Sequence, residues 1–213
     1  MHLLVMVKEP RPGRVKTRLC PPCMPAEAAE LAAAAIADTL DAVAACGADR
    51  RVVALEGEPG PWLPEGFEVI PQAECSLGRR LDHAWEAVGG PGLQIGMDTP
   101  QVDVALLDGA LGLLADGAPC VLGPATDGGW WAIGLQDAVP QLFEPVPTSR
   151  DDTGRLQRER CQALGLEVTE LATLTDVDHA ADAIALAQAA PDSQFGRAVI
   201  ALDLGSRPTT GPQ

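Results

Sequence analysis

The sequence predicts a three-layer α/β fold in which a mostly parallel, mixed sheet lies between two layers of helices. Short apolar runs alternate along the chain with longer amphipathic stretches, which is typical of strands that alternate with helices. The first run, residues 3–7, is apolar at every position, as in a strand buried on both faces. Sheets of this kind bind their ligands at the carboxyl ends of the strands, so we expect the functional residues in the loops that follow them.

The expected elements follow from apolar periodicity and from turn residues. The first helix is expected at residues 25–45, because Pro25 suits a first helical turn and Gly47 can end the helix. Further strands are expected at residues 51–55, 67–70, 93–97, 120–122, 130–133 and 166–171. Further helices are expected at residues 77–88, 104–114, 153–164 and 180–190.

The domain organisation expected from this pattern is simple. Residues 1–190 should form one domain, since 213 residues are too few for two large domains. Residues 191–213 should form a C-terminal extension, with an edge strand at residues 195–204 followed by a flexible tail rich in glycine and proline.

Composition excludes several classes of function. The net charge of −15 argues against a general nucleic-acid binder and against binding to an anionic membrane. No apolar run approaches the roughly 20 residues that span a bilayer, and no signal peptide is recognised, so a cytoplasmic protein with reduced cysteines is expected. The pair Cys20 and Cys23 has no second pair to complete a zinc site, and a thiol redox site is the less favoured alternative.

A basic loop follows the first expected strand. Four of the 15 Lys and Arg residues lie within residues 11–18: Arg11, Arg14, Lys16 and Arg18. Phosphates need converging positive charge and close approach of the backbone, which Gly13 allows. The loop has neither the Walker A spacing nor the G-x-G-x-x-G pattern, and the competing interpretation is a solvated charged surface.

Acidic residues stand at three later positions where strands end or turns occur. Asp98 follows an expected buried strand and can hold Mg²⁺ against a diphosphate, or else cap a turn before Pro100. Asp127 begins an Asp-Gly-Gly turn before two tryptophans, which either stack on a ring or belong to the core. Asp176 and Asp178 point the same way if the segment is extended, although Asp178 can instead cap the following helix.

Taken in order, these motifs resemble those of the GT-A-like nucleotide-diphospho-sugar transferases of the radical-SAM/selenodomain-associated type, also described as arsenosugar-biosynthesis glycosyltransferases. The likeness spans about residues 2–188, and its front part is also similar to phospholactate and phosphoenolpyruvate guanylyltransferases. Met97, His179 and the Trp130-Trp131 pair depart from the family pattern. The matching stretches are residues 8–19, 25–29, 38–40, 77–81, 96–100, 122–129 and 176–178.

The resemblance implies a GT-A fold, a nucleotide bound over the first loop and a Mg²⁺ or Mn²⁺ ion near Asp98. The metal ligands would be Asp98, Asp178 and Asp176, and the catalytic residues Lys16, Asp98 and Asp127. The phosphates would be held by Lys8, Pro12, Gly13, Arg14, Lys16, Arg18 and Arg80. The substrate, through either the acceptor or the sugar hydroxyls, would contact Thr99, Asp127, Gly128, Gly129 and Trp130.

The function expected first is glycosyl transfer from a nucleotide sugar to a small-molecule acceptor. The alternative is nucleotidyl transfer, in which a phosphorylated acceptor attacks an NTP and pyrophosphate leaves. A non-catalytic nucleotide-sensing domain is a third hypothesis. The expected partners are therefore a nucleotide or nucleotide sugar and a small acceptor, with no nucleic acid and no membrane, and a homodimer is compatible with the sequence.

Overall fold

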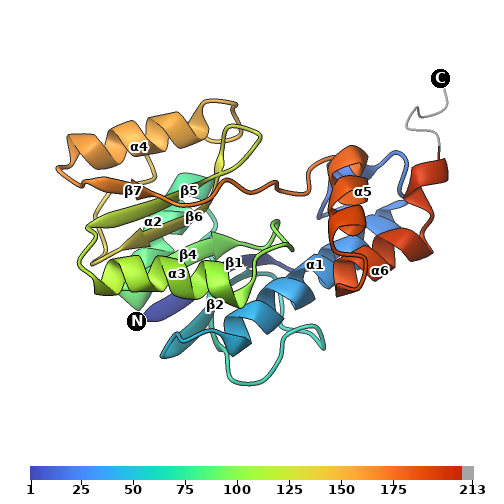
Figure 1. Cartoon of the computed structure of the whole chain (residues 1–213), viewed down its shortest axis with the longest axis horizontal. Helices are drawn as coiled ribbons and strands as arrows, with labels where there is room; N and C mark the ends of the chain where they lie inside the picture. The colour runs from blue at the N-terminus through green and yellow to red at the C-terminus, as the bar shows by residue number, and fades with distance from the viewer. Residues whose placement is uncertain (208–213) are drawn as a thin grey trace.

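Seven strands form one sheet in a computed structural model that describes residues 1–207 (Figure 1). Their order across the sheet is β3-β2-β1-β4-β6-β5-β7. β6 runs antiparallel to β4 and β5, whereas the other neighbouring pairs are parallel, so the expected mixed and mostly parallel sheet is confirmed. The strands are β1 (His2–Lys8), β2 (Arg50–Glu56), β3 (Glu68–Pro71), β4 (Gly92–Gly96), β5 (Cys120–Pro124), β6 (Trp130–Leu135) and β7 (Val168–Glu170).

Helices cover both faces of this sheet, as expected. α1 (Pro25–Ala45) and α3 (Val104–Ala115) pack on one face and share the largest hydrophobic cluster with β1 and β4. α2 (Leu77–Val88) and α4 (Thr153–Ala163) contribute to the clusters on the other face. The chain has few aromatic residues, so aliphatic side chains fill most of this core.

The C-terminal extension contains a helix where an edge strand was expected. α6 (Gln194–Ala201) follows α5 (Ala180–Ala189), so the strand prediction for residues 195–204 is wrong. Ser193 caps the new helix by accepting a hydrogen bond from the backbone N–H of Gly196. After α6 the chain forms a short 3-10 helix, η2 (Leu204–Ser206). The flexible tail was expected beyond residue 204, and its residues 208–213 lie outside the described part of the chain.

α6 packs against α1, well away from the sheet, as Figure 1 shows at the right. The carboxylate of Asp38 in α1 accepts hydrogen bonds from the first two backbone N–H groups of α6, at 2.9 and 2.8 Å. Phe195 and Val199, one helical turn apart, are buried in a cluster with Leu31 and Val177. An i, i+4 pair and the hydrogen bonds to Asp38 therefore stabilise a helix where the sequence suggested a strand.

The position of β1 determines where a ligand can bind. β1 lies between β2 and β4; the connection from β1 to β2 runs through α1 on one face of the sheet, and the connection from β3 to β4 runs through α2 on the other face. A crevice is expected at the carboxyl end of the strands around such a point.

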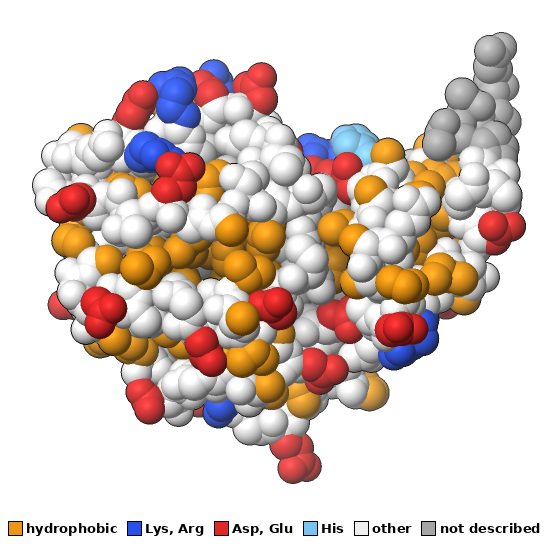
Figure 2. Space-filling model, in the orientation of Figure 1, with side chains coloured by type: hydrophobic (Ala, Val, Ile, Leu, Met, Phe, Trp, Pro, Cys, Tyr) orange, Lys and Arg blue, Asp and Glu red, His pale blue; other side chains and the backbone are white. Residues whose placement is uncertain are grey.

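Acidic side chains lie at many separate places on the face shown in Figure 2, whereas Lys and Arg gather there over α4. Among residues 1–207, no helix combines the length and apolar character needed to cross a bilayer.

Candidate active site

Lys16 joins the basic loop to the rest of the site. The loop leaves β1 and leads into a short 3-10 helix, η1 (Thr17–Leu19), and Lys16 at its start has a left-handed backbone (φ 47°). Its side chain is only 7% exposed. The ammonium group pairs with the carboxylate of Asp98 and donates a 2.5 Å hydrogen bond to the backbone oxygen of Val177. A buried lysine is stabilised by such partners.

Three carboxylates gather opposite this loop. Asp127 comes from the turn between β5 and β6, and Asp176 and Asp178 come from the segment between β7 and α5. One oxygen of each lies within 4.8 Å of the others. Burial, followed by the negative charge of Asp127, raises the pKa of Asp176 to about 6. This mutual repulsion means that a bound divalent cation would stabilise the cluster, and carboxylate oxygens are the ligands that Mg²⁺ and Mn²⁺ prefer.

A buried residue fixes the position of two of these carboxylates. Val177 is fully buried in the cluster formed with α1, α5 and α6. Its N–H donates a 2.9 Å hydrogen bond to the backbone oxygen of Asp98. Asp176 and Asp178 flank it and therefore project together toward the site, as their spacing predicted. Arg18, also from the basic loop, pairs with the carboxylate of Asp178.

The glycines of the Asp-Gly-Gly turn hold the turn against α4. Gly128 has φ +87°, and a Cβ atom there would lie 1.8 Å from the backbone oxygen of Asp151. The oxygen of Gly128 accepts a 2.8 Å hydrogen bond from the N–H of Gly154, at the start of α4. Asp127 accepts a 2.7 Å bond from the N–H of Gly129. The observed role of these glycines is thus to fix the carboxylate of Asp127, and Gly129 also lines the cavity.

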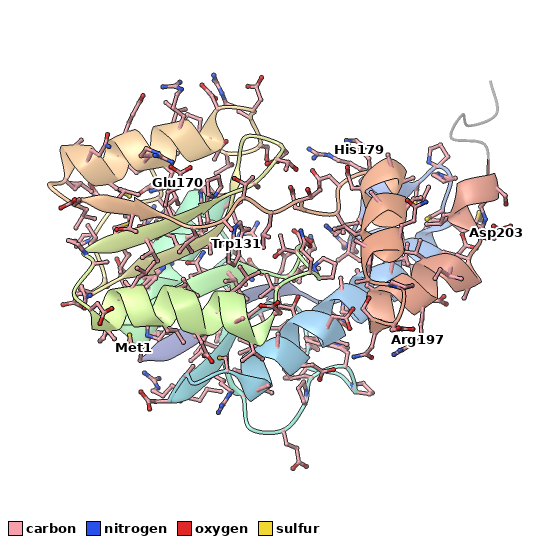
Figure 3. All side chains as sticks on the ribbon, viewed as in Figure 1. Met1, Trp131, Glu170, His179, Arg197 and Asp203 are labelled. Carbon is pink, nitrogen blue, oxygen red and sulfur yellow. The ribbon has the colours of Figure 1, made fainter. Side chains whose placement is uncertain are left out.

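The two tryptophans have different environments. The pairing of β5 with β6 is irregular at Gly123 and Pro124, where Trp131 is the extra residue on β6. Trp131 is buried in the cluster of α1 and α3, and its indole N–H donates to the oxygen of Ala172 (Figure 3). Trp130 is half-buried, stacks at a tilt on Phe143 and lines the cavity. Both tryptophans line the cavity, and Trp130 is the less buried of the two, so its ring is the more accessible to a ligand.

A cavity of about 430 Å³ lies at the carboxyl ends of β1 and β4. It brings together most of the expected site residues: Lys8, Arg18, Arg80, Asp98, Thr99, Asp127, Gly129, Trp130, Asp176 and Asp178. A neighbouring hollow is lined by Arg14, Lys16 and Thr17 with Lys8 and Asp98. Pro12 and Gly13 are exposed at the tip of the basic loop.

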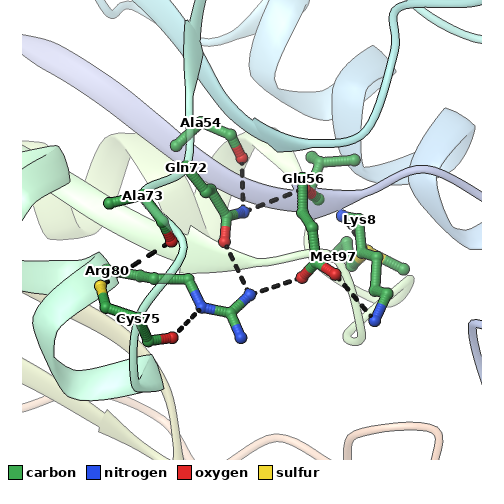
Figure 4. A network of polar contacts seen from close by, with 9 residues as sticks. Lys8, Ala54, Glu56, Gln72, Ala73, Cys75, Arg80 and Met97 are labelled. Carbon is green, nitrogen blue, oxygen red and sulfur yellow. Dashed lines mark hydrogen bonds and ion pairs between the residues drawn. The ribbon is translucent and has the colours of Figure 1, made fainter.

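A polar network that the motifs did not reveal forms one wall of this cavity (Figure 4). Glu56, at the end of β2, pairs with Lys8 at 3.0 Å and with Arg80 at 2.5 Å. Burial alone would raise the pKa of Glu56, but its hydrogen bonds to these two cations hold it below the ordinary value. Gln72 donates to the backbone oxygens of Val7 and Ala54 at 3.0 and 2.8 Å.

This network places the expected phosphate ligands Lys8 and Arg80 against one carboxylate. Their positive charge is therefore partly neutralised by Glu56. In the sequence, Glu56 is only a polar residue at the end of a strand. Such residues are common outside functional sites, so Glu56 could not be recognised as part of this one. The Cys20 and Cys23 pair lies elsewhere, beside α1, and burial raises the pKa of Cys23 to about 11. A thiol with so high a pKa is a poor nucleophile, in agreement with a structural role.

The fold and the cavity define an α/β protein with the Rossmann-like sheet of the nucleotidyltransferases and GT-A enzymes. The chain belongs to a family described as "Uncharacterized protein conserved in bacteria (DUF2064)", whose model matches residues 29–150.

Solved structures with this fold include proteins that use nucleotides. The chain is similar to a candidate nucleotide-diphospho-sugar transferase from Desulfovibrio desulfuricans G20, with 27% identity, a TM-score of 0.82 and coverage of 94% of this chain and 93% of that one.

More distant structures share the fold alone. One is a CMP:2-keto-3-deoxy-manno-octonic acid synthetase complexed with CTP, at 14% identity and a TM-score of 0.54, covering 94% of this chain and 98% of that one. Another is the manganese complex of Rv0371C from Mycobacterium tuberculosis H37Rv, at 18% identity and a TM-score of 0.51, covering 85% and 95%. No curated protein matches the chain.

Proposed function

We propose that this protein is a metal-dependent transferase that uses a nucleotide-activated substrate, with glycosyl transfer from a nucleotide sugar to a small-molecule acceptor as its reaction. The observation that carries the proposal is the cavity in which Lys16 and Arg18 face the carboxylates of Asp127, Asp176 and Asp178. One side of such a site binds phosphate oxygens directly, and the other binds them through a divalent cation. The likeness to a candidate nucleotide-diphospho-sugar transferase supports glycosyl transfer. The proposal includes that the protein is of the radical-SAM/selenodomain-associated type.

The chain's own residues have distinct roles in this reaction. Lys16, Arg14 and Arg18 bind and orient the diphosphate. Asp127, Asp176 and Asp178 hold Mg²⁺ or Mn²⁺, which supplies neutralisation of the charge that develops on the leaving diphosphate. Asp98, which the sequence suggested as a metal ligand, lies outside this cluster of three carboxylates; it keeps Lys16 in place and lines the same cavity. Trp130, Thr99 and Gly129 line the part of the cavity where the sugar and the acceptor meet.

Nucleotidyl transfer is the second candidate, and the position of Lys16 favours it. A buried ammonium group at the centre of the loop suits the crowded charge of an α-phosphate under attack. The two reactions differ in their products. Glycosyl transfer, or slow hydrolysis of a nucleotide sugar, releases a nucleoside diphosphate, whereas nucleotidyl transfer from an NTP releases pyrophosphate.

A thermal-shift panel tests the shared part of both candidates. NTPs and nucleotide sugars are added to the protein with and without Mn²⁺ or Mg²⁺, and we expect a nucleotide to raise the Tm when the metal is present. Asp178→Asn should remove most of the metal-dependent part of this rise, whereas Asp116→Asn, an exposed position at the end of α3, serves as the matched control. If no nucleotide raises the Tm of the wild type with any metal, the proposed function is wrong.

A further inference from the structure

Gln94 is a polar residue buried inside the sheet at the inner wall of the cavity. It lies in the middle of β4 and is 1% exposed. Its side chain lines the cavity, yet its carbonyl oxygen has no hydrogen-bond partner among the described residues. Buried amide groups are normally satisfied, so an unpartnered one that opens onto a cavity indicates a group of the ligand.

The surroundings of Gln94 indicate which part of a ligand would bind to its side-chain amide. Its strand partners Leu4 and Ile133 belong to the clusters on the α2 face of the sheet. The cavity wall on this side consists of apolar and aromatic side chains, contributed by β1, α2 and β6: Met6, Leu77, Leu81 and Trp130. The charged residues of the nearby wall, Lys8, Glu56 and Arg80, already pair with one another. These two cations share one carboxylate, so a net positive charge remains at that wall, whereas the apolar side chains beside Gln94 favour an uncharged group.

Thr99, in the loop that follows β4, also has a buried polar group without a partner among residues 1–207. It is 2% exposed, it lines the same cavity, and the unpartnered group is its hydroxyl. A hydroxyl group of a ligand both donates and accepts hydrogen bonds, so neighbouring hydroxyls can satisfy the amide oxygen of Gln94 and the hydroxyl of Thr99 together. An uncharged group with several hydroxyls beside an indole ring is a sugar.

We propose that Gln94 is a specificity-determining residue that hydrogen-bonds a hydroxyl of the sugar carried by the nucleotide diphosphate, with Thr99 as a second contact. This inference rests on the proposed function, because it assigns the sugar part of the same substrate. It goes beyond it by naming the residue that distinguishes a nucleotide sugar from the nucleoside diphosphate alone.

The substitution Gln94→Met separates this role from a structural one. Methionine has a similar length and shape but no hydrogen-bonding amide, so the free protein should keep its Tm or gain slightly. Trp85→Phe is the matched control, because the indole nitrogen of Trp85 is also buried without a partner among the described residues, and Trp85 does not line the cavity. Both variants thus remove an unsatisfied buried polar group, and only one of them faces the ligand.

Calorimetric titration in the presence of Mn²⁺ provides the test, with UDP, UDP-glucose, GDP and GDP-mannose as probes. For whichever nucleotide binds, we expect Gln94→Met to weaken binding of the nucleotide sugar by roughly 10- to 100-fold and to leave the nucleoside diphosphate within about twofold of the wild type. Thr99→Val should act in the same direction, and Trp85→Phe should change neither Kd.

Three results would overturn the inference. Equal weakening of the nucleotide sugar and the diphosphate would place Gln94 elsewhere in the nucleotide site, and no weakening of either would leave it without a binding role. A clear loss of Tm in Gln94→Met would mean that the amide serves the fold. In each of these cases the wild type still binds nucleotide, whereas a wild type that binds none of the four probes and no nucleotide of the thermal-shift panel refutes the proposed function and this inference together.

Discussion

Asp176 is held close to Asp127 and Asp178 in a partly buried position, and neutralising it should make the metal-free protein more stable. Burial first, and then the charge of Asp127, raises the pKa of Asp176 from 3.8 to about 6. Each pKa unit corresponds to about 1.36 kcal/mol, so the ionised carboxylate destabilises the folded state by up to about 3 kcal/mol above pH 6. Asp176→Asn removes this charge and keeps the side-chain shape.

The direction of the pH dependence follows from the raised pKa. The folded state retains the proton of Asp176 between pH 3.8 and 6, where the unfolded state has lost it. The wild type therefore loses stability relative to Asp176→Asn as the pH rises through this window. We expect the variant to be more stable by about 2 to 3 kcal/mol at pH 7.5 and equal to the wild type below pH 4.

Urea unfolding at several pH values, with a chelator present, measures this difference. Asp116→Asn, at an exposed position, controls for the loss of one negative charge from a protein of net charge −15. Added Mn²⁺ should then stabilise the wild type far more than Asp176→Asn. Equal stability of the two proteins at pH 7.5 without metal would refute the reasoning, as would an equal response to Mn²⁺.

Three further predictions concern the fold around the site. Burial, and then the charge of Arg50, lowers the pKa of His2 from 6.5 to about 4. The free energy of unfolding of the wild type should therefore fall by about 3 kcal/mol as the pH drops from 6.5 to 4, because only the unfolded state takes up the proton. His2→Phe should remove this pH dependence from the free energy of unfolding measured with urea. Gly128→Ala should lower stability by more than about 2 kcal/mol in thermal unfolding, since its Cβ would clash with a backbone oxygen, whereas Gly66→Ala, with a similar φ and open space, should cost about 1 kcal/mol or less. Asp38→Ala should cost about 1 to 3 kcal/mol by removing both hydrogen bonds to the start of α6, and hydrogen exchange should show faster opening of that helix than of the sheet.

Much of the fold could be predicted from the sequence because its strands are buried on both faces. β1 is apolar at every position from residue 3 to 7, and α1 has a proline at its start, so local pattern and tertiary environment agree there. α6 was missed because its short sequence fits two periodicities. The choice between them depends on Asp38, more than 150 residues earlier in the chain, which no local pattern contains.

The candidate site was predictable where charge concentrates and not where single polar residues face a cavity. Lys16 and the pair Asp176 and Asp178 stand out in the sequence, and the structure brings them to one cavity edge. Glu56 and Gln94 do not stand out, because one follows an ordinary strand and the other interrupts an apolar run. Their importance depends on which strands are neighbours, and that is a property of the strand order.

The double attachment of Lys16 affects how variants of this protein should be interpreted. One ammonium group holds the side chain of Asp98 and the backbone beside Asp176 and Asp178. Replacing Lys16 would release the segment between β7 and α5 as well as remove a charge, so a Lys16 variant would show weakened metal affinity although the lysine is itself no metal ligand. Genetic screens that score metal dependence would therefore place Lys16 among the acidic residues. Only a structural measurement of residues 176–178 would reveal that Lys16 affects metal binding indirectly, by positioning the metal ligands.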